Sequence, residues 1–297
     1  MLKNIVRKLK NSLLLLVLMS LIVGCVDQNQ ATASSQKIVA TSIAVTEILS
    51  ALEVSADHIV GVPSSDTYSL PEEYADIKTV GTAMSPDMEI VAQVNPSLII
   101  SPNSLEGDLA SQYEKANINS VFLNLKSVNG MYKSIEELGT LLNKEEQAEK
   151  LVNEFVDYMK TYQSQNKDKT KPKVLILMGL PGSYVVATSS SYVGNLVELA
   201  GAENVYGDGD GTDFLNVNPE DMLKQNPDMI LRTSHALPDQ VKEMFANEFS
   251  TNGIWKQFDA VKNNKVYDLN YEYFGMSANF NYQKGLKELE GIFYGNT

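Results

Sequence analysis

KEEQAEKLVNEFVDYMKTYQSQNK, residues Lys144 to Lys167, lies between two segments of similar size that are both rich in short apolar runs. Its apolar residues recur at steps of three and four, which places them on one face of an α-helix. No Gly or Pro interrupts the stretch, so it predicts one helix about 35 Å long at about 1.5 Å per residue. Pro172 follows, where a helix cannot continue. The apolar face consists of Ala148, Leu151, Val152, Phe155, Met159 and Tyr162.

This helix is interpreted as a rigid strut that joins two halves of the chain. The alternative is an ordinary amphipathic helix inside one large domain. At 297 residues and 43% hydrophobic composition, the chain is long and apolar enough for two cored domains.

The chain is strongly acidic, with a formal net charge of −13. Four of its 24 Lys and Arg residues, and no acid, lie in the first 24 positions, so the remainder carries 20 bases against 37 acids. Nucleic-acid binding needs clustered bases and is therefore not expected. A single cysteine excludes an intrachain disulfide.

The N-terminus has the pattern of an export signal. A basic stretch from Lys3 to Lys10 precedes an apolar run, 13–23, that is too short for a stable membrane span. The run ends in LIVGC, which resembles the lipobox of bacterial lipoproteins. That resemblance implies a lipidated Cys25, with palmitate among the acyl groups, anchored in the membrane on the extracellular face; two acyl chains anchor stably. Residues 26–36 are small and polar and read as part of a flexible tether.

Beyond the tether, short apolar runs alternate with helical patterns, which is typical of a parallel α/β sheet. The same alternation returns after the long helix. This predicts two Rossmann-like lobes with a ligand cleft between them. The predicted strands are KIVAT (37–41), HIVGV (58–62), KTV (78–80), SLIIS (97–101), SVFLN (120–124), KVLILMG (173–179), YVVAT (184–188), DMILR (228–232) and KVYDL (265–269).

Two segments repeat one layout. EIVAQVNPSLII (89–100) and EDMLKQNPDMIL (220–231) each have a Glu, a short helical pattern, Asn-Pro and an apolar strand. The residue before proline is pushed out of the α region, so both helices should end there. The repeat favours two related lobes, although convergent βαβ patterns would give the same echo.

Two loops that follow predicted strands could carry chemistry, because ligands bind beyond the carboxyl ends of parallel strands. Gly81 to Pro86 follows KTV, with Ser85 expected to cap the next helix and Pro86 at its first position. Thr233 to Leu237 follows DMILR and precedes a helix near Pro238. These loops should bring Met84 and His235 together from different lobes. A thioether and an imidazole suit haem iron, although packing by Met84 and hydrogen bonding by His235 are the commoner roles.

The mature chain resembles a class III substrate-binding lipoprotein of ABC importers, the group that carries siderophores, cobalamin and haem. The stretch WKQFDAVKNNKVYDL (255–269) is a marker of that class. Within it, the chain resembles the haem receptors of the Isd system. The stretches that carry this resemblance are IVATSIAVTEI (38–48), GTAMSPDME (81–89), LMGLPGSYVVAT (177–188), LRTSHALP (231–238) and FGMSAN (274–279).

The resemblance implies one non-covalently bound haem b with Met84 and His235 as axial ligands. Its propionates would meet backbone N–H groups near Ile43, Ala44 and Ser65, and helix N-termini favour such anions. Met276 would line the pocket or replace Met84, with packing as the alternative.

The resemblance also implies partners. One Glu from each lobe, here Glu89 and Glu220, would dock onto Arg residues of an ABC permease; solvated glutamates near helix N-termini are the alternative. Haem-donating surface proteins would supply the ligand to a monomeric receptor.

The expected protein is a non-enzymatic haem receptor for iron uptake. The alternatives are a ferric-siderophore or cobalamin receptor on the same scaffold, or a surface adhesin without a ligand. The expected divisions are a signal peptide (1–24), a tether (25–36), an N-terminal lobe (37–143), an inter-lobe helix (144–168) and a C-terminal lobe (169–297).

Overall fold

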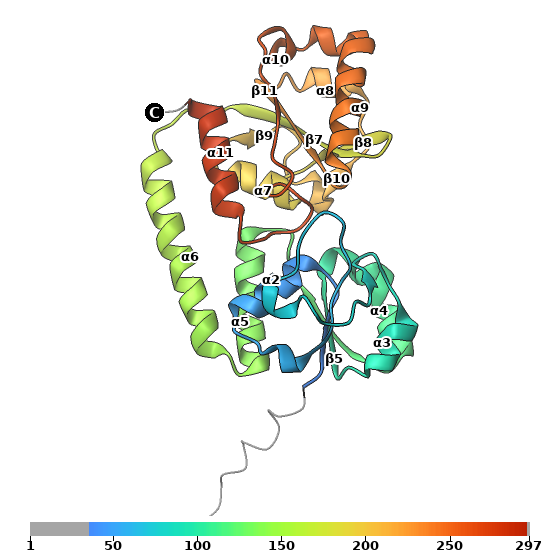
Figure 1. Cartoon of the computed structure of the whole chain (residues 1–297). Helices are drawn as coiled ribbons and strands as arrows, with labels where there is room; N and C mark the ends of the chain where they lie inside the picture. The colour runs from blue at the N-terminus through green and yellow to red at the C-terminus, as the bar shows by residue number, and fades with distance from the viewer. Residues whose placement is uncertain (1–35, 296–297) are drawn as a thin grey trace, which may run out of the picture. The chain divides into compact units, whose positions relative to one another are not determined.

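The structure, a computed structural model, describes residues 36–295 (Figure 1). The predicted signal peptide, Cys25 and all but the last residue of the predicted tether lie outside the described residues. Among residues 36–295, no helix is long and apolar enough to cross a membrane.

The first lobe is built on a four-stranded sheet in which every strand pair is parallel, in the order β2-β1-β5-β6. Its central strands are buried along their whole length, as expected for a parallel sheet covered on both faces. The strands are β1 (Ile38–Ala40), β2 (Ile59–Gly61), β5 (Leu98–Pro102) and β6 (Asn119–Leu123).

Helices cover this sheet, and serine side chains begin two of them. Ser42 Oγ accepts the N–H of Val45 at 3.3 Å, and Ser127 Oγ accepts the N–H of Gly130 at 3.0 Å. The helices are α2 (Ile43–Ala51), α3 (Met88–Val94), α4 (Glu106–Lys115) and α5 (Val128–Leu142), with 3₁₀ turns η1 (Ala56–His58), η2 (Glu72–Tyr74) and η3 (Asn103–Leu105).

The second lobe has a six-stranded sheet in the order β10-β8-β7-β11-β12, with β9 also paired to β7. The strands are β7 (Lys173–Leu180), β8 (Ser183–Ala187), β9 (Glu203–Asn204), β10 (Phe214–Leu215), β11 (Met229–Ser234) and β12 (Val266–Asp268). The helical segments are α7 (Tyr192–Leu199), η4 (Gly209–Gly211), α8 (Pro219–Lys224), α9 (Pro238–Thr251), η5 (Gly253–Gln257), α10 (Asp259–Lys262) and α11 (Tyr282–Tyr294).

The expectation of a purely parallel sheet is wrong for this lobe. β8 runs antiparallel to β7, and β10 runs antiparallel to β8. Only Pro181 and Gly182 separate β7 from β8, and a connection of two residues can join only antiparallel strands. Gly182 takes the positive φ of 80° in this turn.

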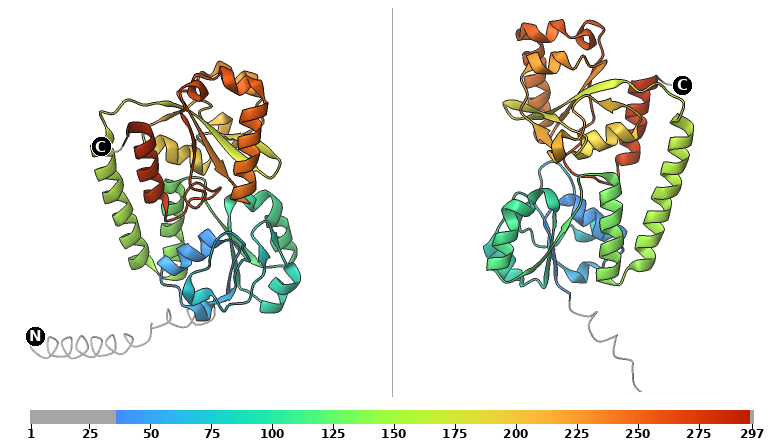
Figure 2. Two further views of the ribbon diagram at one scale, coloured as in Figure 1. Left: turned by 45° about the horizontal axis from the view of Figure 1, so that its top comes forward. Right: turned by 180° about the vertical axis from the view of Figure 1, so that it is seen from behind.

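The long helix α6 runs from Glu145 to Asn166, 22 residues that span about 33 Å at about 1.5 Å per residue. It buries Ala148, Phe155, Met159 and Tyr162 from the expected apolar face. It lies side by side with α5 in both views and leads in the chain from the first lobe to β7 (Figures 1 and 2).

An aromatic cluster packs α5, α6 and α11 together. Tyr132 of α5 stacks on Phe155 of α6, with 4.2 Å between ring centroids. Tyr282 of α11 stands edge-on to both rings at 6.0 Å. One buried core contains residues of both sheets, among them Ile100 of β5 and Ile176 of β7. The two lobes therefore share packed side chains.

The repeated layout predicted for 89–100 and 220–231 is present in the structure. Helices α3 and α8 both end before Asn-Pro, and Asn95 and Asn226 both have a φ of 49°. Both asparagines adopt the left-handed conformation, which Asn tolerates better than most residues, instead of the extended one expected before proline. Strands β5 and β11 follow these turns.

Substitution of Gly194 in α7 should destabilise the second lobe. A Cβ there would lie 1.9 Å from the carbonyl oxygen of Thr188, whereas a Cβ at Gly107 in α4 would meet nothing within 4 Å. We expect Gly194→Ala to lower the free energy of unfolding by about 1–3 kcal/mol. Gly107→Ala should raise it by up to about 1 kcal/mol. Urea unfolding measures both, and equal effects of the two variants would contradict the packing described.

Candidate functional site

Met84 lies at the tip of a short β-hairpin. β3 (Gly81–Thr82) pairs antiparallel with β4 (Ser85–Pro86), which leaves Ala83 and Met84 in the turn. The Met84 side chain is 68% exposed, the highest value among the exposed large apolar residues of the described chain. The sulfur is thus presented outward and is not used in the core.

The predicted cap of the following helix is wrong. Asp87 caps α3, and its Oδ1 accepts the N–H groups of Glu89 at 3.0 Å and Ile90 at 3.1 Å. Ser85 and Pro86 belong to β4. Gly81, with φ 96°, makes the hairpin possible, because a Cβ there would lie 2.7 Å from the Ser85 carbonyl oxygen.

Backbone hydrogen bonds tie this hairpin to the first lobe. The N–H of Val80 donates to Val62 O at 2.9 Å, and that of Asp87 donates to Val80 O at 2.7 Å. The predicted strand 78–80 is present only as an isolated bridge between Thr79 and Val62. The hairpin is therefore anchored at its base while its tip is free.

His235 follows β11 directly, because this strand continues to Ser234, two residues beyond the predicted end at Arg232. Its N–H donates to Gly179 O at 3.1 Å, which continues the pairing of β11 with the central strand β7. The side chain is half-buried, and this burial lowers the pKa of the imidazole from its ordinary 6.5. The neutral ring, which can offer a nitrogen lone pair to a metal, is therefore favoured.

The start of α2 offers backbone donors. Ile43 and Ala44 occupy its first turn and are half-buried. First-turn N–H groups have no acceptor within their own helix and carry the positive end of its dipole. A carboxylate placed here would therefore be stabilised.

Ser65 organises a turn that contacts the second lobe. Its Oγ accepts the N–H groups of Thr67 at 3.3 Å and Tyr68 at 3.0 Å. The Tyr68 hydroxyl donates to the carbonyl oxygen of Tyr271, 3.1 Å away, and burial raises its pKa to about 12. This hydrogen bond joins the loop of the first lobe to the segment that follows β12.

Met276 and Tyr184 have packing contacts in the structure. Met276 is half-buried and packs against the main core. The hydroxyl of Tyr184 donates to Glu248 Oε1 at 3.2 Å, and its ring packs against Trp255.

Glu89 and Glu220 occupy equivalent positions in the two lobes. Each is the second residue of its helix, α3 or α8, and each is exposed. Neither carboxylate forms an ion pair within residues 36–295. Both are available to an external cation.

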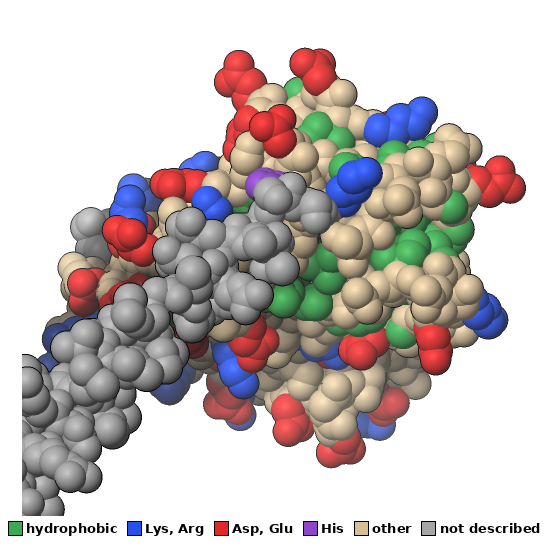
Figure 3. All heavy atoms as spheres, turned by 90° about the horizontal axis from the view of Figure 1, so that it is seen from below, with side chains coloured by type: hydrophobic (Ala, Val, Ile, Leu, Met, Phe, Trp, Pro, Cys, Tyr) green, Lys and Arg blue, Asp and Glu red, His purple; other side chains and the backbone are tan. Residues whose placement is uncertain are grey.

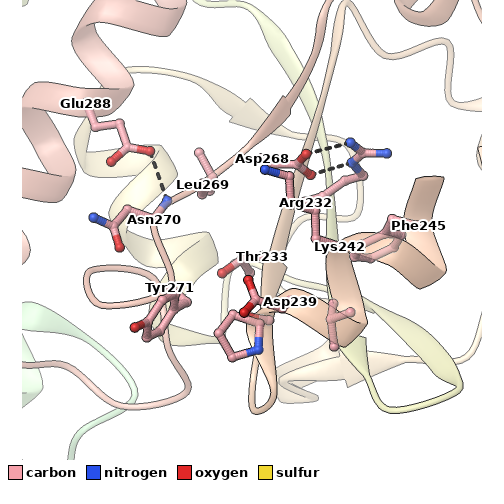
Figure 4. Close-up of a pocket in the computed structure, with 13 residues that line it drawn as sticks. Arg232, Thr233, Asp239, Lys242, Phe245, Asp268, Leu269, Asn270, Tyr271 and Glu288 are labelled. Carbon is pink, nitrogen blue, oxygen red and sulfur yellow. Dashed lines mark hydrogen bonds and ion pairs between the residues drawn. The ribbon is translucent and has the colours of Figure 1, made fainter. Parts of the chain in front are cut away.

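A cavity of about 330 Å³ lies in the second lobe, beside the end of β11 (Figure 4). Neither Met84 nor His235 lines it. Arg232 lies in this cavity with its guanidinium held by Asp268 in two hydrogen bonds of 2.7 and 2.8 Å, and with its charge 4.8 Å from the ring centre of Phe249. Its charge is thus already neutralised.

The described residues contain no group of three or more His, Cys, Asp or Glu side chains that could hold a metal ion. On the face in Figure 3, Lys and Arg are scattered among Asp and Glu without forming a basic cluster.

Comparison with known proteins identifies the class. The family model described as periplasmic binding protein matches residues 38–273, so the chain belongs to this family. It is 40% identical over 268 residues to the high-affinity heme uptake system protein IsdE of Staphylococcus aureus (strain Newman), which covers 90% of each chain.

Two solved structures of similar proteins have the same fold as this chain. S. aureus IsdE complexed with heme matches with a TM-score of 0.82 at 39% identity, covering 88% of this chain and 99% of that one. An ABC transporter substrate-binding protein from Listeria monocytogenes EGD-e matches with a TM-score of 0.82 at 45% identity, covering 88% of this chain and all of that one. The predicted two-lobed α/β architecture is confirmed.

Sequence reasoning missed three features of this region. Asp87 rather than Ser85 caps α3, and the signal was present, since Asp is a strong cap residue. Lys126 of the first lobe pairs with Asp213 of the second at 2.9 Å, a long-range contact without a local signal. Leu237 is 48% exposed and left-handed, with a φ of 47°.

Glu47, one turn beyond Ala44, is a half-buried carboxylate. Burial raises its pKa from the ordinary 4.5, and it forms no ion pair within the described residues. It lies close enough to Tyr68 and Tyr192 to raise the pKa of both phenols. Glu73 on η2 is the opposite case, because a hydrogen bond from Ser50 lowers its pKa.

Glu47→Gln should stabilise the apo-protein at neutral pH. The folded state binds the Glu47 proton more tightly than the unfolded state, so wild-type stability falls as pH rises from 4.5 through the raised pKa. The variant should melt higher than wild type at about pH 7.5 and equally at about pH 4. Thermal unfolding tests this, with Glu73→Gln as the control that gains nothing at neutral pH. A Glu47→Gln variant less stable than wild type at neutral pH would contradict the assignment.

Proposed function

We propose that this protein is a haem receptor that delivers haem to an ABC permease for iron uptake. One observation carries the proposal: the chain is 39% identical, over nearly its whole described length, to a receptor solved with heme, and it offers one thioether and one neutral imidazole from separate lobes. Met84 lies at the tip of a hairpin in the first lobe, and His235 directly follows strand β11 of the second lobe.

The residues fit haem b bound non-covalently. Haem supplies an iron with two open axial positions and a large apolar ring. His235 provides nitrogen and Met84 provides sulfur. The first-turn N–H groups at Ile43 and Ala44, together with the Ser65 turn, would hold the carboxylates of the porphyrin. Met276 would line the pocket or replace Met84 as the ligand.

The residues of this chain fit the alternative ligands, a ferric siderophore or cobalamin, less well. An anionic ferric siderophore needs cationic side chains in its site, and Arg232 is already paired with Asp268. Tyr184 is likewise engaged, with Glu248. A cobalamin receptor or a ligand-free adhesin gives no reason for an exposed Met84 at a hairpin tip. The relatives are solute-binding proteins, which agrees with a receptor rather than an enzyme.

The proposal includes a place at the membrane. Cys25 would carry the lipid anchor on the extracellular face, and residues 26–36 would give the receptor reach. α6 would act as a rigid strut between the lobes. Haem-donating surface proteins would load the monomeric receptor.

Replacement of either axial ligand should change the iron spectrum. We expect the wild-type haem complex to be six-coordinate and low-spin. Met84→Ala and His235→Ala should each remove that signature and weaken haem binding by more than about tenfold, or about 1.4 kcal/mol. Met84 is exposed, so its removal should leave apo-protein stability unchanged. Visible absorption with added haem is the measurement, and Met244→Ala, in α9 and outside the proposed site, is the control.

The proposal is wrong if the purified protein binds no haem. The ligand assignment is wrong if the spectrum survives in both variants. Preferential binding of a siderophore from a panel would favour the alternative cargo.

The two exposed glutamates should act in delivery and not in binding. We expect Glu89→Gln combined with Glu220→Gln to weaken association with the permease, with the loss greatest at low salt, because exposed charges are screened as salt rises. Haem affinity should not change. Glu106, exposed in the first turn of α4, provides the control Glu106→Gln. Equal permease binding by the double variant and the control would exclude the docking role.

A further inference from the structure

Leu237 adopts a backbone conformation that its residue type disfavours. Eight non-glycine residues between positions 36 and 295 have a positive φ. Five of them are Asn, the others are Glu53, Asp210 and Leu237, and Leu237 is the only apolar one. Asn and Asp tolerate the left-handed region because their short polar side chains bond locally, whereas Leu has no such compensation.

Two further features of the position speak against Leu. Pro238 follows it, and the residue before proline prefers the extended region. Leu237 is also the N-cap of α9 and makes no side-chain cap bond, whereas the N-caps of α2, α3 and α8 are Ser42, Asp87 and Asn218, each with a capping hydrogen bond. An Asn at 237 would suit the conformation.

The Leu237 side chain does not serve the core either, since it is 48% exposed. Four large apolar side chains are exposed in the described part of the chain. Leu141 and Val156 lie on the α5 and α6 helices. The other two, Met84 and Leu237, lie on the two loops proposed to hold haem. Neither the backbone, the cap nor the core accounts for Leu at this position, which leaves its apolar surface as the reason.

We propose that Leu237 is a ligand-contacting residue that packs against the porphyrin ring on the same side as His235. The inference rests on the proposed function and extends it to a residue two positions beyond the iron ligand. Backbone strain persists at ligand-binding positions where the surroundings hold it in place. Pairing of His235 N–H with Gly179 O and the start of α9 at Pro238 hold Leu237 from both sides. Burial of its side chain by the ring would exclude water from the His235 side of the iron.

The test compares Leu237→Asn with Leu141→Asn, which removes the exposed leucine of α5. The first readout is the rate of haem loss to excess apomyoglobin. The second is the affinity for metal-free protoporphyrin IX, which has no iron for His235 or Met84 to bind. The third is the thermal unfolding of the apo-protein.

We expect Leu237→Asn to speed haem loss by about tenfold, since about half of a leucine side chain would no longer be buried. Metal-free porphyrin should bind more weakly by a similar factor. The apo-protein should be at least as stable as wild type, because Asn suits the left-handed conformation. Leu141→Asn should leave both porphyrin readouts unchanged. Leu237→Gly, which also tolerates a positive φ, should reproduce the porphyrin effects.

Haem loss and porphyrin affinity within twofold of wild type in both Leu237 variants would overturn the inference. A lower apo-protein stability in both, with porphyrin binding reduced only in proportion to unfolding, would also overturn it and assign Leu237 a structural role. Failure of the wild-type protein to bind any porphyrin would instead overturn the proposed function.

Discussion

The packing between the two lobes is the constraint on which the proposed site depends. Tyr132, Phe155 and Tyr282 interlock α5, α6 and α11. Nearer the second sheet, the N–H of Ala278 donates to Leu125 O at 2.8 Å. These contacts belong to a core shared by both lobes, one of which carries the Met84 hairpin and the other the His235 loop. A shared core favours small lobe movements over wide opening.

Each loop combines a fixed base with an outward apolar tip. Val80 and Asp87, which flank the Met84 hairpin, are hydrogen-bonded to Val62 and to each other, and the His235 loop continues the pairing of β11 with β7. The tips, Met84 and Leu237, remain exposed in the protein alone. Burial of such side chains by a large apolar ring would provide binding free energy, while the anchored bases limit the conformational entropy lost on binding.

The sequence predicted the elements well where the signal was local. The helix expected over 144–167 is observed from Glu145 to Asn166, and both Asn-Pro pairs follow the end of a helix. The direction of β8 was missed, because apolar periodicity identifies a strand but not its partner; the Pro181-Gly182 dipeptide was the available signal. The Met84 hairpin was missed because its strands are only two residues long, too short for an apolar alternation to show, and Gly81 at its start was the available signal. The strain at Leu237 depends on backbone angles that no residue pattern reports. The prediction that Met84 and His235 bind the iron rested on the family resemblance as much as on the residues themselves.

The central claim is that Met84 and His235, offered by separate lobes, bind opposite sides of one iron atom. X-ray absorption at the iron edge of the haem complex tests it most directly, because sulfur and nitrogen neighbours scatter differently. The account predicts one sulfur in the first shell of the wild-type complex, and none once Met84 is replaced. A first shell of nitrogen and oxygen alone, or a sulfur that persists without Met84, would contradict it.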